Sequence, residues 1–121
     1  MSENEITVLT DVVLITCIVQ RGKADDIVLA AQAAGASGAT VHFAKGSGIR
    51  ERLGVLGVAV EVEKEVISIL SPTDHANHIF ETMHKAAQLD TPGMGFMYIT
   101  PVEKAATYIP PGVLARLREK K

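Results

Sequence analysis

Two histidines and an aspartate form the cluster best suited to binding a metal ion. His75 and His78 are three residues apart and directly follow Asp74, so that both imidazoles share one face of an expected helix. A tetrahedral site needs a third and a fourth ligand converging on them. His84 projects from a different direction, and Glu81 is the only nearby carboxylate on that face. We therefore favour a solvated helix face and predict no metal site.

A glycine-punctuated turn, Gly46-Ser-Gly48, could hold a phosphate, because glycine lets backbone N–H groups approach an anion closely. No G-x-G-x-x-G or P-loop spacing follows it, so the turn alone identifies no nucleotide site. Cys17 lies within an apolar run, where a thiol is inert. We find no Ser-His-Asp arrangement and no paired acid–base carboxylates. The sequence therefore favours a protein that is not an enzyme.

The composition fits one globular domain of 121 residues, with 47% hydrophobic and 21% charged residues. A net charge of −2 argues against a nucleic-acid partner. A single cysteine favours a reducing compartment, and the acidic, polar first residues differ from a signal peptide. The longest apolar run, 12–19, is about half of what a bilayer requires. We expect a cytoplasmic protein.

The hydrophobic periodicity predicts the order strand, helix, strand, strand, helix, strand. The expected elements are a strand over 8–19, a helix over 24–34, strands over 38–45 and 58–70, a helix after residue 71, a strand over 96–100 and a short helical turn over 101–106. The strand over 58–70 is firmest at 66–70 and is interrupted by charged residues, Glu61, Glu63, Lys64 and Glu65. Ser71 is expected to cap the second helix and Pro72 to open it. This order is the ferredoxin-like, split βαβ pattern, an α+β fold with an antiparallel four-stranded sheet.

The first strand is apolar on both of its faces. Alternate residues place Val13, Ile15, Cys17 and Val19 on one face, and Val12, Leu14, Thr16 and Ile18 on the other. Two helices can cover only one face of a four-stranded sheet. The second face therefore needs another cover, and a further copy of the chain is the simplest one. We expect an obligate oligomer.

Five segments together resemble the P-II signalling proteins. Gly22–Ile27 looks like the opening of the family's first helix, and Gly38–Gly48 resembles the strand that leads into its long T-loop. Ser71–Asp74 lies where the family begins its second helix. Gly93-Met-Gly95 resembles the G-D-G turn of the B-loop, and Thr100-Pro-Val-Glu103 resembles its L-P-V-E. The likeness runs over about 12–106, and its specificity lies in the order and spacing of the motifs.

The resemblance implies a homotrimer whose sheets face inward and which binds an adenine nucleotide such as ATP, ADP or AMP between its subunits. It implies no resident cofactor. It also implies regulation of a protein partner, which in that family is often a membrane transporter or a metabolic enzyme. Carried over by position, the effector-binding residues are Thr40, Gly46, Gly48, Arg50, Leu70, Gly93 and Gly95.

The phosphate-binding side chains of that family are replaced here. Met94 and Phe96 stand where the family has an aspartate and a lysine, and its two C-terminal arginines fall near Thr107 and Ile109. Arg50 is shifted by one position from the family's T-loop arginine. Desolvated phosphate oxygens require such cations. We therefore expect a less charged nucleotide or another anion, with an empty pocket as the remaining alternative.

The expected T-loop equivalent covers 46–65, within a domain over 8–109 that lies between a flexible start, 1–7, and a tail, 110–121. It contains no tyrosine, which excludes uridylylation there. Its basic and aliphatic residues either bind a partner or pack on the trimer itself. They are Arg50, Arg52, Leu53, Val55 and Leu56. The alternative functions are a metal-responsive trimer similar to the divalent-cation tolerance proteins and, ranked last, a small ferredoxin-like enzyme.

Overall fold

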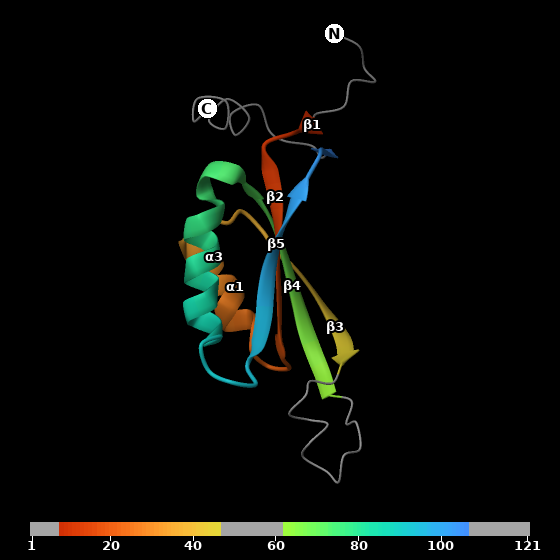
Figure 1. Cartoon of the computed structure of the whole chain (residues 1–121), viewed down its shortest axis with the longest axis vertical. Coiled ribbons are helices and arrows are strands. Elements are labelled where there is room, and N and C mark those ends of the chain that lie inside the picture. Colours follow the sequence, from red (N-terminus) through yellow and green to blue (C-terminus); the bar gives the residue numbers. More distant parts are fainter. Residues whose placement is uncertain (1–7, 47–61, 107–121) are drawn as a thin grey trace.

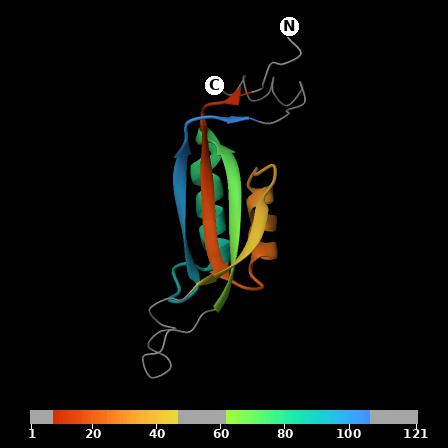
Figure 2. The same ribbon diagram turned by 90° about the vertical axis from the view of Figure 1, so that its right-hand side faces the viewer.

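The central strand, β2 (Val12–Gln20), is built from the β-branched run that predicted it. In the computed structural model, which describes residues 8–46 and 62–106, β2 pairs with β4 (Val62–Pro72) on one side and β5 (Gly95–Val102) on the other. β3 (Thr40–Gly46) pairs with the outer side of β4. The sheet has the order β3-β4-β2-β5 and is antiparallel throughout (Figure 2).

Both helices lie on one side of this sheet (Figure 1). α1 (Ala24–Ala33) and α3 (Thr73–Ala87) pack against each other and against β2 and β4. The core between the two layers contains Ile15, Cys17, Val19, Ile27, Ala31, Ile67, Ile69, Ile79 and Met83. These observations confirm the α+β, ferredoxin-like fold with its four-stranded antiparallel sheet.

A single carboxylate connects the sheet to the first helix. Glu65 of β4 is only 9% exposed, and its Oε1 accepts hydrogen bonds from the backbone N–H groups of Gly22, Lys23 and Ala24 at 2.7, 2.9 and 3.0 Å. Lys23, the N-cap residue of α1, makes no capping bond with its own side chain. Glu65, although it lies in β4, therefore accepts the hydrogen bonds that an N-cap side chain would accept, and its negative charge complements the helix dipole.

The expected start of the second helix is wrong. Ser71 is 1% exposed and lies in β4, where it pairs with Val13, and its hydroxyl donates to the Pro72 carbonyl at 2.9 Å. α3 begins at Thr73, whose N–H group donates to the Asp11 carbonyl at 2.9 Å. Strand pairing with β2 outweighs the local capping signal, and a distant backbone carbonyl provides the bond that Ser71 was expected to make.

The helical turn expected over 101–106 is also wrong. β5 continues to Val102, and β6 (Ala105–Ala106) pairs with β1 (Val8–Leu9). The strand expected over 8–19 is therefore two strands, β1 and β2. Residues 105–106 are extended because their backbone groups find partners about one hundred positions away in β1. The expected flexible start, 1–7, and tail, 110–121, lie outside the described residues.

Both ends of the expected 46–65 loop are strand. The ladder between β3 and β4 continues to the pair Gly46 and Val62, so residues 62–65 belong to β4. Glu63 and Glu65, which interrupted the apolar pattern, each have a partner that explains a charge on a strand: Arg21 for Glu63 and the start of α1 for Glu65. Residues 47–61 lie outside the described part of the chain.

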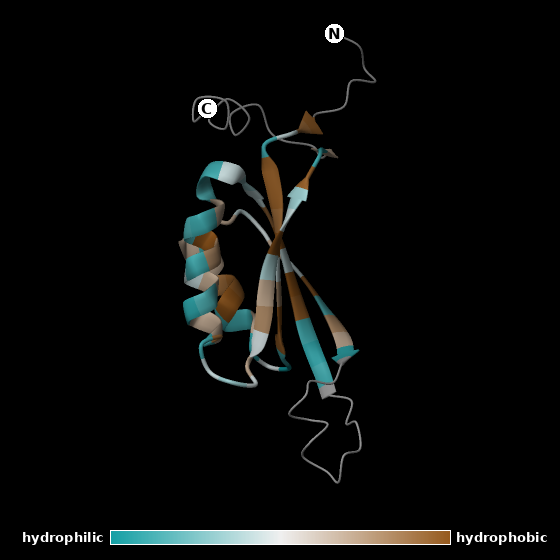
Figure 3. Ribbon diagram, in the orientation of Figure 1, coloured by the Kyte–Doolittle hydropathy of each residue, from teal (hydrophilic) through white to brown (hydrophobic). Residues whose placement is uncertain are grey.

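The sheet face opposite the helices is uncharged over its first four rows, and a fifth row of Gln20, Lys64 and Ala44 adds one lysine at the end of the face. The third row carries four hydroxyl groups. Figure 3 shows the hydrophobic colour continuing along β2, which both faces share, whereas the outward side of α3 is hydrophilic. The first four rows are Val12, Pro72 and Val102; Leu14, Leu70 and Thr100; Thr16, Ser68, Tyr98 and Thr40; and Ile18, Val66, Phe96 and His42.

Replacing Glu65 by alanine should lower the free energy of unfolding by about 3 kcal/mol, because three backbone N–H groups lose a charged acceptor in a largely buried place. Chemical denaturation measures this difference. Glu63→Ala is the matched control, since its half-exposed ion pair with Arg21 contributes at most about 1 kcal/mol. Equal losses in the two variants would contradict the capping role of Glu65.

Candidate functional site

The turn before β5 is held against the end of β2. Gln20 donates from Nε2 to the Gly93 carbonyl at 2.9 Å, and Gly95 stands opposite Val19 in the sheet. Gly93 and Gly95 have φ values of +84° and +136°, which residues with a Cβ rarely adopt. A Cβ on Gly95 would in addition overlap the Ile18 carbonyl oxygen. The backbone of this turn therefore requires glycine at position 95.

The remaining effector-binding candidates lie across the sheet from that turn. Thr40 and Leu70 are diagonal neighbours on the open face, because Thr40 stands opposite Ser68. Gly46 ends β3 at the same end of the sheet as Gly95, but β4 and β2 lie between them. Three strand spacings amount to about 14 Å. One small ligand would have to span this distance, or sit where two copies meet, to contact both groups.

Gly48, Arg50 and all five expected partner-binding residues lie outside the described residues, as do Thr107 and Ile109. The assignment of effector-binding residues therefore stays a prediction. What the structure describes are the backbone positions of five of the seven candidates. They are Thr40, Gly46, Leu70, Gly93 and Gly95.

An aromatic pair lies at the position where the resembled family has a phosphate-binding lysine and this chain has Phe96. Phe96 is 56% exposed on the open face, and its ring stacks on that of Tyr98 with centroids 6.1 Å apart and an interplanar angle of 23°. In the sequence alone, Phe96 indicates only that a cationic side chain has been replaced. The signal that could have revealed the pair is the i, i+2 spacing of two aromatic residues in a strand, which places both rings on one face.

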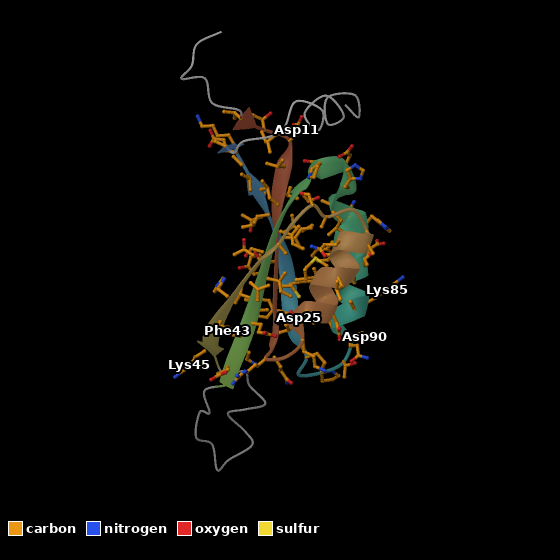
Figure 4. All side chains as sticks on the ribbon, turned by 180° about the vertical axis from the view of Figure 1, so that it is seen from behind. Asp11, Asp25, Phe43, Lys45, Lys85 and Asp90 are labelled. Atoms are coloured by element: carbon orange, nitrogen blue, oxygen red, sulfur yellow. The ribbon has the colours of Figure 1, made fainter. Side chains whose placement is uncertain are left out.

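A concave region lies at the β3 edge, and we call it the β3-edge pocket. It has a volume of about 490 Å³ and is lined by Arg21, Phe43, Ala44, Lys45 and Glu63. Figure 4 shows Phe43 and Lys45 on β3, away from both helices. The sequence did not indicate this pocket, because it depends on the β3–β4 register that places Lys45 opposite Glu63.

The histidine cluster and the cysteine offer little reactive chemistry. His75 Nε2 and Asp74 Oδ1 are 4.0 Å apart, and the described residues contain no group of three or more His, Cys, Asp or Glu side chains that could hold a metal ion. Burial raises the pKa of the Cys17 thiol to about 11, so that the thiol is protonated at neutral pH. No helix in the described ranges is long and apolar enough to cross a bilayer.

Comparison with known proteins places these features in a family context. The family described as nitrogen regulatory protein P-II matches residues 12–109. Among solved structures, Arabidopsis thaliana PII bound to citrate superposes with a TM-score of 0.63 at 20% sequence identity, covering 78% of this chain and 79% of that one. A search among curated proteins gave no match. The structural likeness supports the fold, and the family match covers nearly all of the described sheet and both helices.

Proposed function

The chain belongs to the nitrogen regulatory protein P-II family, and on this premise we propose that it is a homotrimeric regulator that binds a small effector between its subunits and acts on a protein partner. The observation that carries the proposal is the open face of the sheet. Its first four rows contain no Asp, Glu, Lys or Arg, and Lys64 stands in the fifth row at the end of the face. An uncharged face of this extent is suited to being covered by another protein surface.

The row of hydroxyl groups favours a second copy of the same chain as that cover. Thr16, Ser68, Tyr98 and Thr40 run across the sheet in register, and none of their hydroxyl groups makes a hydrogen bond to another described residue. A hydroxyl group is both donor and acceptor. One such row can therefore bond with an identical row, because each hydroxyl group can donate to and accept from the other.

The proposed effector is a small anion with fewer charges than ATP. Thr40 and Leu70 present a hydroxyl and an apolar side chain on the open face, and the glycines at 93 and 95 offer backbone access. The position of the missing lysine carries the ring of Phe96 instead, which can stack on a planar ligand but cannot neutralise phosphate. Citrate is bound in the solved Arabidopsis PII, so a carboxylate belongs among the candidates beside ADP and AMP.

Regulation of a partner requires only that the effector prefer one arrangement of the partner-binding segment. We assign that segment to 46–65, with Arg50, Arg52, Leu53, Val55 and Leu56 as contact residues. By family analogy the partner is a membrane transporter or a metabolic enzyme. The metal-responsive alternative has no comparable support among the described residues, since they provide no third ligand beside His75 and His78.

A lysine in the centre of the open face should dissociate the oligomer, because burying an unpaired charge between subunits is costly. The variant Ser68→Lys tests this, with Gln32→Lys on the exposed side of α1 as the control. Sedimentation velocity should give the wild type and the control at three times the 12.9 kDa chain mass, and Ser68→Lys at one chain mass. Circular dichroism verifies that the variant is folded. A monomeric wild type, or a trimeric Ser68→Lys, would overturn the proposed assembly.

An effector should raise the melting temperature of the chain. A ligand present at one hundred times its Kd stabilises the folded state by about 2.7 kcal/mol, which corresponds to roughly 5 °C or more at this size. The panel is ATP, ADP, AMP and citrate, and we expect ATP to give the smallest shift. Thr40→Val should weaken the shift by removing a hydroxyl group from the effector site without placing a charge on the open face, whereas Ser37→Val, an exposed change outside the sheet, should preserve it. If no ligand acts, the proposed effector class is wrong.

Partner capture should depend on the two arginines of the 46–65 segment. Reversing the charge of Arg50 and Arg52 together should reduce capture of the partner in pull-downs, because a basic segment loses its complementarity. The same change at Arg116 and Arg118 in the tail is the matched control. Capture that is equal in both double variants, and equal with and without effector, would refute this part of the mechanism.

A further inference from the structure

The β3-edge pocket lies on the opposite face of the sheet from the proposed subunit contacts. Phe43 and Lys45 stand opposite Glu65 and Glu63 in the β3–β4 ladder, so that their side chains project to the side on which the helices lie. Phe43 is 68% exposed, more than any other large hydrophobic side chain in the described residues. Neither α1 nor α3 therefore covers it. The volume of about 490 Å³ is within the range of small-molecule sites.

The charges around this pocket sum to one positive charge. Arg21 Nη1 and Glu63 Oε2 form an ion pair at 2.7 Å, and this pair leaves the guanidinium with unused N–H groups. The ammonium group of Lys45, although the residue stands opposite Glu63 in the ladder, makes no ion pair or hydrogen bond with another described residue. The pocket therefore contains one ammonium group that is available to an anion, with a guanidinium group beside it.

The backbone around the pocket is held in place before any ligand arrives. Lys45 and Glu63 are held by the β3–β4 ladder, and Arg21 directly precedes Gly22, whose N–H group is bonded to Glu65. Exposed Phe43 lies two residues before Lys45 on the same face of the strand. A flat apolar ring and two cations carried on a fixed backbone lower the ordering cost for a ligand with matching parts.

We propose that the β3-edge pocket binds a planar aromatic carboxylate, with its ring against Phe43 and its carboxylate between Lys45 and Arg21. The ligand carries one negative charge because the pocket has a net charge of one, and Glu63 opposes a second anionic group. The site is separate from the effector site between subunits, and it uses none of the residues assigned there.

Benzoate is the probe for this site, with two matched compounds. Benzamide has the same ring without the charge, and cyclohexanecarboxylate has the charge without an aromatic ring. Titration of the full chain in ¹H–¹⁵N spectra should shift the amide signals of Phe43, Lys45 and Glu63, and benzoate should bind more tightly than either analogue. Added salt should weaken its binding, because the exposed charges are screened. Shifts confined to Gly93 and Gly95 would place benzoate in the effector site and overturn the proposal.

Variants at exposed positions assign the roles of the two side chains. Lys45→Gln should raise the Kd of benzoate about fivefold, as expected for one exposed ion pair, and Phe43→Ala should raise it by about fivefold through loss of ring contact. Lys85→Gln on α3, far from the pocket in Figure 4, is the control and should leave the Kd unchanged. The same spectra report whether each variant is folded. An unchanged Kd in Lys45→Gln, or equal binding of benzamide and benzoate, would overturn the proposal.

Discussion

The carboxylate of Glu65 organises the end of the sheet at which both candidate sites lie. It draws the backbone of Gly22, Lys23 and Ala24 onto β4 and thereby sets where α1 begins. Its neighbours depend on that placement: Arg21 reaches Glu63, and Gln20 reaches the Gly93 carbonyl. A helix N-terminus needs acceptors for its first N–H groups, and here the need is met across the fold instead of within the helix. One buried carboxylate thus couples a strand, a helix and two turns.

The two faces of β2 impose a second constraint. Both are apolar, yet α1 and α3 cover only one of them, and on the other face the four rows from Val12 to Ile18 are uncharged, with Lys64 beyond them at the end of the face. Formal charges gather instead at the lower end of β3 and β4, where Lys45, Glu63 and Arg21 meet. This separation lets one face associate through apolar and hydroxyl groups while the other keeps ionic chemistry accessible to solvent.

The features that depend on neighbouring residues in the chain were predicted correctly from the sequence. The order of the elements, α1 to within a residue of its end, and the family resemblance were all available from periodicity and short motifs. Features that depend on distant partners were not. Ser71 carries a genuine capping signature, but pairing with Val13 holds it in β4. Glu65 interrupts an apolar run, and only the folded chain reveals that it accepts bonds from residues more than forty positions away. The β3-edge pocket likewise requires the register between two strands.

In the turn before β5, packing against β2 restricts some residues, and others are free to vary. Gly95 cannot change without a clash against Ile18, and Gln20 fixes the Gly93 carbonyl, so packing against β2 alone is enough to preserve this backbone. The side chains at 94 and 96 face no such demand, because neither a buried partner nor an unusual φ restricts them. Phe96 can therefore replace a cation while the turn stays intact. The backbone of this turn is therefore independent of the side chains at 94 and 96, and the exposed rings of Phe96 and Tyr98 stack beside it on the open face.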